Sequence, residues 1–171
     1  MSIRVRQLQK DQGLLWRDLR LAALADSQDE FATNYESQVG RSEAEWQRVI
    51  DERVADPRSA SFVAEIEGES AGMAFCQLDT TDRRVAHVYS FWVAPTFRRR
   101  GVGRALLASA LVWIRTQGAQ VAELSVNETS ESAISLYAAA GFADTGRREP
   151  LREGSPQQRV VMRCTLGIDG S

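Results

Sequence analysis

The chain has 171 residues, of which 43% are apolar and 26% are charged; these values are typical of one globular domain and argue against a disordered chain. No apolar run approaches the roughly 20 residues that a membrane-spanning helix needs, and the first residues form no apolar signal core, so we expect a cytoplasmic protein without a membrane partner. The net charge of −2 and the near absence of lysine argue against a nucleic-acid partner, and one histidine with two distant cysteines argues against a metal site.

The first predicted elements along the chain are a strand and two helices. Alternating apolar residues predict a strand over residues 3–8, and apolar residues at helical spacing predict a helix over 11–25. The polar residues 26–30 break that spacing and predict a loop. A capping-box pattern at residues 42–45 predicts the start of a second helix, which runs to about Val54.

The middle of the chain predicts three strands and a helix. Residues 61–67 and 71–78 flank a turn centred on Gly68, a pattern typical of an antiparallel hairpin. Residues 84–93 are rich in β-branched and aromatic side chains and predict the next strand. Residues 102–117 then predict a helix that ends at a glycine.

Four more elements, a strand, a helix and a closing strand pair, are predicted over residues 121–126, 130–140, 142–147 and 158–165. The complete order, β-α-α-β-β-β-α-β-α-β-β, predicts an α/β (α+β) protein with a mixed sheet and helices on both faces. No linker or internal repeat interrupts residues 1–166, so we expect one domain there, followed by a frayed tail over residues 167–171.

The most informative segment is the loop over residues 95–104, which reads PTFRRRGVGR and joins a predicted strand to a predicted helix. Gly101 and Gly103 lack side chains, so a ligand can approach the backbone closely there. The free N–H groups at a helix start and the positive end of its dipole both favour anions. Four arginines in seven residues add positive charge. The loop therefore predicts a binding site for a polyphosphate.

Spacing excludes two familiar phosphate loops. A P-loop has Lys-Ser/Thr after its second glycine, whereas Arg104 and Ala105 stand there in this chain. A dinucleotide fingerprint has Gly or Ala three residues after its second glycine, and that position is Leu106. A nucleotide-dependent dehydrogenase is therefore a distant alternative.

The remaining pattern, Arg98-x-x-Gly101-x-Gly103, resembles the acyl-coenzyme A pyrophosphate loop of the GNAT N-acetyltransferase superfamily, which reads Gln/Arg-x-x-Gly-x-Gly/Ala. The family's second coenzyme A segment is matched by Asn127, Ala133, Ile134, Ser135, Leu136, Tyr137, Gly141 and Phe142. The resemblance implies a GNAT-like mixed, mostly antiparallel sheet of about seven strands flanked by about four helices. It also implies that acetyl-coenzyme A donates an acetyl group, without a metal, to a primary amine of a small molecule or peptide by direct attack. Homodimers are common in such families.

The resemblance also assigns cofactor contacts. The backbone amides of residues 99–104 would hold the pyrophosphate, and the end of the preceding strand would splay from its neighbour and pair with the pantetheine arm. Asn127 would bond the pantetheine amides, although the family's second asparagine is replaced by Ser130, which fits a helix cap. The expected contacts are Phe91, Val93, Arg98, Arg99, Arg100, Gly101, Val102, Gly103, Arg104, Asn127 and Tyr137.

Three residues are candidates for catalysis. Phe91 occupies, by position, the place of the backbone N–H that stabilises the oxyanion. Tyr137 resembles the family's general acid, because a phenol keeps its proton at neutral pH, but its place on an apolar helix face also fits packing alone. His87 stands where many relatives carry a glutamate general base, and an ordinary strand histidine is the alternative.

The acceptor side is less defined by the sequence. Residues 1–80 hold 15 acidic and 9 basic side chains, whereas residues 81–171 hold 8 and 12, a division that suits a cationic acceptor and an anionic cofactor. Asp29 and Glu30 could attract a protonated amine. The nearby residues Trp16, Phe31, Tyr35, Glu36 and Trp46 fit the core or the surface as well as a substrate contact. A non-catalytic acyl-coenzyme A binding module, which kept the loop and lost the chemistry, remains the alternative function.

Overall fold

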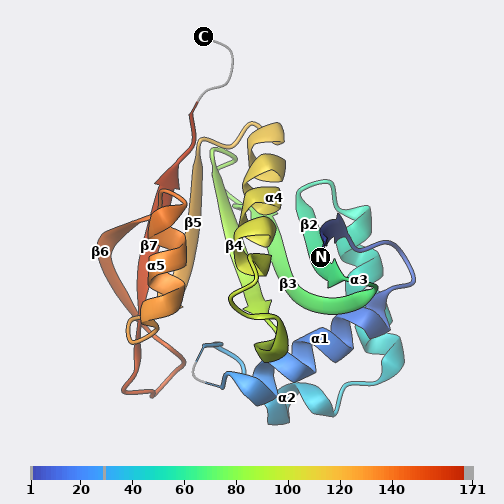
Figure 1. The fold of residues 1–171 in the computed structure, drawn as a ribbon. Helices are drawn as coiled ribbons and strands as arrows, with labels where there is room; N and C mark the ends of the chain where they lie inside the picture. Colours follow the sequence, from blue (N-terminus) through green and yellow to red (C-terminus); the bar gives the residue numbers. More distant parts are fainter. Residues whose placement is uncertain (1, 29, 168–171) are drawn as a thin grey trace.

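The protein is described by a computed structural model that places residues 2–28 and 30–167. Its centre is one seven-stranded sheet with the spatial order β1-β2-β3-β4-β5-β7-β6 (Figure 1). The strands are β1 Ile3–Gln7, β2 Ser59–Ile66, β3 Glu69–Leu78, β4 Val85–Val93, β5 Val121–Asn127, β6 Ala143–Pro150 and β7 Gln158–Thr165. Neighbouring strands are antiparallel except β4 and β5, which are parallel. This is the mixed, mostly antiparallel sheet of seven strands that the sequence predicts.

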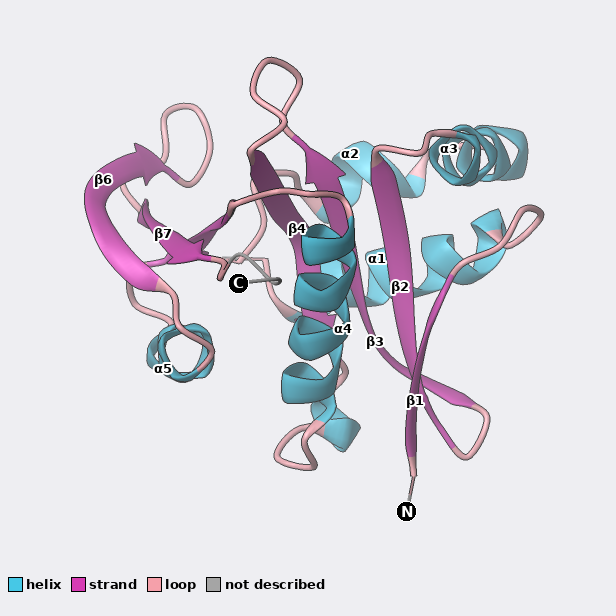
Figure 2. Cartoon of the chain, turned by 90° about the horizontal axis from the view of Figure 1, so that it is seen from above, coloured by secondary structure: helices cyan, strands magenta, loops and turns pink. Residues whose placement is uncertain are grey.

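The helices form a layer on each face of the sheet, as Figure 2 shows from above. They are α1 Gly13–Asp26, α2 Tyr35–Val39, α3 Glu43–Ala55, α4 Val102–Thr116 and α5 Glu131–Ala139, with a 3-10 turn at Pro95–Phe97. Helices α4 and α5 cover one face, and α1 to α3 cover the part of the other face formed by the first strands. Of the helices in the described ranges, none is both long and apolar enough to cross a bilayer.

Two cores hold these layers together. The first lies under α4, whose Leu106 and Ile114 are fully buried against β2 to β5. The second lies between α1, α3 and the opposite face of β2 to β4, around Trp16 and Trp46. Strand β2 serves both cores, because successive side chains of a strand point to opposite faces. Burial also raises the pKa of Cys76 to about 12, which agrees with the buried structural thiol expected from its apolar neighbours.

The structure differs from the predicted elements at a few boundaries. Helix α2 was not predicted, because five residues are too short to show helical periodicity; Asn34 caps it by accepting from the Ser37 N–H. Helix α1 begins at Gly13 rather than residue 11, because Asp11 adopts a left-handed φ of 71°. Strand β6 continues to Pro150, beyond its predicted end. Of the frayed tail predicted over residues 167–171, residues 168–171 lie outside the described residues.

Candidate functional site

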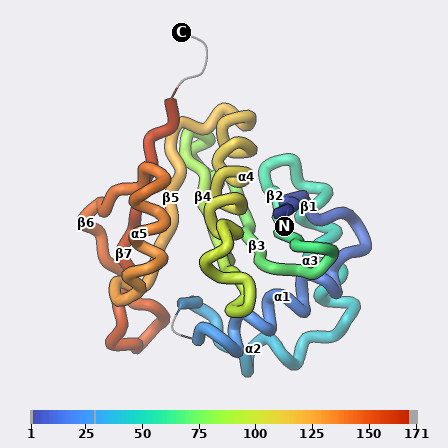
Figure 3. Tube along the Cα trace, in the orientation of Figure 1, coloured from blue at the N-terminus to red at the C-terminus, as the bar shows by residue number. Residues whose placement is uncertain are grey.

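The parallel strands β4 and β5 pair over only part of their length. Three couples join them, and the last is His87 with Glu123. Beyond this couple the strands separate, which is visible in Figure 3 between the two traces. A bulge also interrupts β4, where Ser90 has a φ of 54° and the register with β3 shifts before Trp92. The sheet therefore opens as a wedge at the carboxyl ends of its two parallel strands.

A cleft of about 1470 Å³ occupies this wedge and reaches both faces of the sheet. The predicted catalytic and cofactor-binding residues line it as a group, and among them only Arg100 does not. Those in the lining are His87, Phe91, Val93, Arg98, Arg99, Gly101, Val102, Gly103, Arg104, Asn127 and Tyr137. The fold thus brings the loop, the end of β4 and the start of α5 to one cavity.

The loop before α4 has the backbone of an anion cradle. Arg99 and Gly101 have left-handed φ angles of 62° and 87°. The first hydrogen bond of the helix runs from the Ala105 N–H to the Gly101 carbonyl, and Gly101 provides no side-chain cap, so the N–H groups just after Gly101 precede the helical ladder. Gly103 faces α5 closely, because a Cβ there would lie 3.1 Å from Leu136 Cδ2. These features fit a pyrophosphate bound at the helix N-terminus.

The loop arginines divide into two groups. Arg98 holds the loop in place, because its Nε donates to the Val93 carbonyl at 3.0 Å and its Nη2 lies 2.6 Å from an Asp26 oxygen. Partial burial alone would raise the pKa of Asp26. Hydrogen bonds from Ser27, Trp92 and Arg98 outweigh this effect, so the pKa lies below its ordinary value. Arg100 lies over the Phe97 ring at 5.7 Å, outside the cleft.

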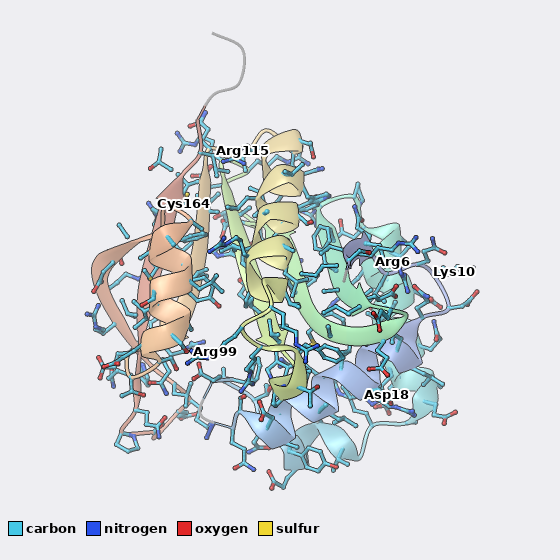
Figure 4. The ribbon with its side chains drawn as sticks, viewed as in Figure 1. Arg6, Lys10, Asp18, Arg99, Arg115 and Cys164 are labelled. Carbon is cyan, nitrogen blue, oxygen red and sulfur yellow. The ribbon has the colours of Figure 1, made fainter. Side chains whose placement is uncertain are left out.

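Arg99 and Arg104 are the loop arginines that line the cleft without an ion pair among the described residues. Figure 4 shows Arg99 near the N-terminal ends of α4 and α5. Their charges stand next to the free amides at the start of α4, where they would add to the attraction for a bound phosphate.

Tyr137 both packs and lines the cleft. Its side chain is 6% exposed, and its ring meets the Phe91 ring edge-on at 5.6 Å and the Phe142 ring at 6.1 Å. Burial, with a smaller contribution from the negative charge of Glu30, raises its pKa far above the ordinary value. It is therefore a buried phenol that keeps its proton in the wall of the cleft.

The side chain of Asn127 is committed to protein contacts. It is 2% exposed, its Nδ2 donates to Gln157 at 3.0 Å, and its Oδ1 accepts from the N–H and hydroxyl of Thr129. It shapes the turn between β5 and α5, and its predicted coenzyme A contact stays a prediction. Ser130 stands at the N-cap of α5, as expected, but its hydroxyl donates to Glu30 and accepts no hydrogen bond from the first N–H groups of the helix.

His87 has a carboxylate partner that the sequence analysis missed. Its Nε2 lies 2.8 Å from Asp79 Oδ1, and its ring stacks on Tyr89 at 5.5 Å. Asp79 also accepts from the N–H and hydroxyl of Thr81 and from the Asp82 N–H. The bond from His87, followed by these bonds, holds the pKa of Asp79 far below its usual range. The sequence contains a turn pattern, Asp-x-Thr-Asp, that begins at Asp79. It does not show that the fold brings this carboxylate into contact with His87.

A charged patch continues from His87 over the face of the sheet opposite α4 and α5. Glu123 lies 2.7 Å from Arg163 Nη2 and 3.7 Å from Arg147. Glu149 joins the same network through Arg147 and Arg159. Most of this network lines the cleft. Alternation on β5 to β7 places these side chains on one face, but only the strand order brings them together.

The loop after α1 closes this side of the cleft. Arg152 Nη2, from the loop between β6 and β7, donates to the carbonyls of Gln28 at 2.6 Å and Phe31 at 3.3 Å. Glu30 reaches Ser130 at the start of α5. Of the expected acceptor-side residues, Glu30 and Phe31 line the cleft, and Trp16 and Trp46 belong to the core. Asp29 lies outside the described residues.

The sequence profile of the acetyltransferase (GNAT) family matches residues 21–142 of the chain, from α1 to the end of α5. The chain belongs to this family. Its members use acetyl-coenzyme A, so the family match and the helix-start cradle agree on the same ligand.

Individual relatives agree with this assignment. An uncharacterized N-acetyltransferase of Methanocaldococcus jannaschii is 32% identical over 48% of this chain and 38% of its own length. An aminoglycoside N(6')-acetyltransferase type 1 of Stenotrophomonas maltophilia is 26% identical over 84% and 88%. The YncA structure from Salmonella typhimurium, with its cofactor acetyl-CoA, has a TM-score of 0.79 at 17% identity and covers 100% of this chain and 96% of its own. The chain spans only 38, 32 and 41% of the first three curated relatives that it matches.

Proposed function

We propose that this protein is an N-acetyltransferase that moves an acetyl group from acetyl-coenzyme A to a primary amine. One observation supports the proposal: the loop before α4, Phe91, Tyr137 and His87 line one cleft between two strands, and Asp79 is hydrogen-bonded to His87 from outside the lining. The cradle and Tyr137 belong to the side of α4 and α5, whereas His87 faces the charged patch. Acetyl-coenzyme A and the amine would therefore enter the cleft from opposite faces of the sheet.

The donor side would hold the cofactor through backbone groups. The N–H groups at the start of α4, with Arg99 and Arg104, would bind the pyrophosphate. When bound, acetyl-coenzyme A supplies an acetyl group activated as a thioester. The Phe91 N–H, just after the bulge, would donate to the carbonyl oxygen as it gains charge, and one such donor is worth about 3–4 kcal/mol of barrier.

The acceptor side would remove a proton from the amine. Because Asp79 is held ionised, it accepts the Nε2 proton of His87, which leaves Nδ1 as the basic nitrogen. The amine nitrogen then forms the new bond to the acetyl carbon as the carbon–sulfur bond breaks. His87 takes the proton that the amine loses, and Tyr137 gives its proton to the departing sulfur.

The test is release of free thiol from acetyl-coenzyme A in the presence of amines, amino acids, aminoglycosides and peptides. We expect release with at least one amine and a fall in kcat of about 10²- to 10⁴-fold in His87→Gln. The affinity for coenzyme A, measured by calorimetry, should stay unchanged in that variant. Tight coenzyme A binding without thiol release from any acceptor would instead identify a non-catalytic binding module.

A further inference from the structure

We propose that the acceptor carries a carboxylate beside its amine, as amino acids do, and that Arg20 binds this carboxylate. The inference rests on the proposed function and narrows its acceptor class. Arg20 lies on α1 and lines the cleft on the side that faces the charged patch.

Arg20 lacks the anionic partner that an enclosed cation needs. Its Nη1 donates to Ser90 Oγ at 3.3 Å, its Nη2 donates to Thr33 Oγ1 at 2.9 Å, and its guanidinium lies 5.0 Å from the centre of the Phe31 ring. Both hydrogen-bond acceptors are neutral hydroxyls, and no described carboxylate lies within 4.0 Å of the side chain. Burial, and secondarily the charge of Arg41, lower its pKa to about 10. This partly buried guanidinium has N–H donors that these two hydrogen bonds do not use, so it has donors to spare for an anion.

The lack of pairing is shared by two neighbouring arginines. Arg53 lies 3.8 Å above the Phe75 ring, and Arg41 lies 5.4 Å above the Trp46 ring. Neither makes an ion pair with a described residue, and burial together with the charges of Arg20 and Arg41 lowers the pKa of Arg53 to about 10. The three side chains thus make a positive region without an ion-paired carboxylate among the described residues, and of the three Arg20 is the one that lines the cleft.

The other arginines on this side of the cleft are paired. Arg98 pairs with Asp26, and Arg147 and Arg159 pair with Glu149. Arg99 and Arg104 also line the cleft without an ion pair among the described residues, but they belong to the loop before α4, on the donor side. Arg20 is therefore the arginine without a described carboxylate partner on the face of the cleft that carries the charged patch.

The position of Arg20 suits a group attached to the reacting amine. Its contact with Ser90 places the guanidinium beside the bulge, one residue before the proposed oxyanion donor. Glu123, opposite His87 on the neighbouring strand, and Glu149 are the carboxylates of the charged patch, and both are already paired with arginines. A carboxylated acceptor brings an anion to Arg20, whereas a plain amine leaves Arg20 without one and a polyamine brings more positive charge to it.

The experiment compares amines that differ only in the carboxylate. Each L-amino acid, β-alanine and 4-aminobutanoate is assayed for thiol release beside its decarboxylated counterpart. We expect wild-type kcat/KM to favour the carboxylated member of the best pair. In Arg20→Gln that preference should fall by about 10- to 100-fold, with little change for the decarboxylated amine, because a charge-assisted hydrogen bond is lost. Arg20→Lys, which keeps the charge but not the planar fork, should lie between the two.

Two controls make the result decisive. Arg17→Gln changes an arginine of the same helix that pairs with Asp18 and Glu43 outside the cleft, and it should leave the preference intact. Calorimetry with coenzyme A and the preferred amino acid checks that Arg20→Gln keeps the first ligand and loses the second. Thiol release without preference for carboxylated amines, or equal losses for both members of a pair, overturns this inference alone. No release from any amine refutes the proposed function and this inference with it.

Discussion

At the scale of single residues, hydrogen-bond partners set the protonation that the chemistry needs. Asp79 receives bonds from a histidine, a hydroxyl and two backbone N–H groups, so its carboxylate stays ionised throughout the neutral range. Tyr137 is in the opposite state, since its apolar surroundings favour the neutral phenol. These are the protonation states that the proposed base pair and the proposed acid would need.

The Asp79→Asn substitution tests whether the carboxylate positions the imidazole. We expect kcat to fall by about tenfold or more, since an amide can turn and stabilise the wrong imidazole tautomer. Asp82→Asn alters the same turn away from the cleft, where Asp82 pairs with Arg84, and it should leave kcat unchanged. An unchanged kcat in Asp79→Asn would show that the pair has no catalytic role.

The Tyr137→Phe substitution separates acid catalysis from packing. It should lower kcat by about 10²-fold and leave the affinity for coenzyme A intact. Because burial raises the pKa of Tyr137, its contribution to stability is complete below the unfolded value of about 10 and is lost as pH rises above it. The melting temperature of the wild type should therefore fall more steeply than that of the variant above pH 10. Tyr35→Phe, outside the cleft, is the matched control; equal kcat in both variants would leave Tyr137 only a packing role.

At the scale of elements, the junction of β4 and α4 carries the donor site. The strand is bulged at Ser90, the loop turns through left-handed residues, and α4 begins without a side-chain cap. A helix without a side-chain cap is less stable by typically about 1 kcal/mol. Its first N–H groups are then free to donate to phosphate oxygens.

Replacement of the two left-handed glycines at opposite ends of α4 tests whether the start of this helix binds phosphate. Gly101 and Gly118 have φ angles of 87° and 82°, and a Cβ would meet no backbone at either site. Gly101→Ala and Gly118→Ala should therefore each cost about 1–2 kcal/mol of unfolding free energy. Only Gly101→Ala should weaken coenzyme A binding, by about tenfold or more, because only that end of the helix would hold the phosphates in the proposed complex. Equal affinities in the two variants would contradict the cradle.

The pattern of apolar and polar residues within each helix or strand was sufficient to predict most of the secondary structure. Alternation and helical spacing predicted all seven strands and four of the five α-helices, because each signal lies within a short stretch of chain. Helix α2 was not predicted, because a helix of five residues is too short to show a helical repeat of apolar side chains. The start of α1 was placed too early because the left-handed conformation of Asp11 leaves no trace in hydrophobicity.

At the scale of the whole molecule, the cleft depends on contacts between its two halves. The loop after α1 belongs to the first half of the chain, and it is held by Arg152 and Ser130 from the second half. Figure 1 shows this loop reaching from the end of α1 toward β5 and α5. The acceptor chamber is therefore bounded by both halves, whereas the phosphate cradle belongs to a single junction.

The Arg152→Ala substitution should loosen only the acceptor side. Two charge-assisted bonds to backbone carbonyls are lost, so we expect a decrease of about 1.5–3 kcal/mol in unfolding free energy and a higher KM for the amine. The KM for acetyl-coenzyme A should not change. Arg148→Ala, which removes surface pairs with Asp144 and Glu128, should leave both Michaelis constants unchanged. A rise in the KM for acetyl-coenzyme A with Arg152→Ala would contradict the division between the two sides.

The amino-acid sequence alone determined the elements, the phosphate loop and the family resemblance, because these depend on residues close together along the chain. The partners on the acceptor side were decided by the tertiary structure. Arg20 meets Ser90 across 70 residues, Glu30 meets Ser130 across 100, and Arg163 meets Glu123 across 40. Such pairs depend on strand order, register and the bulge in β4, and no local periodicity encodes which side chains a register brings face to face.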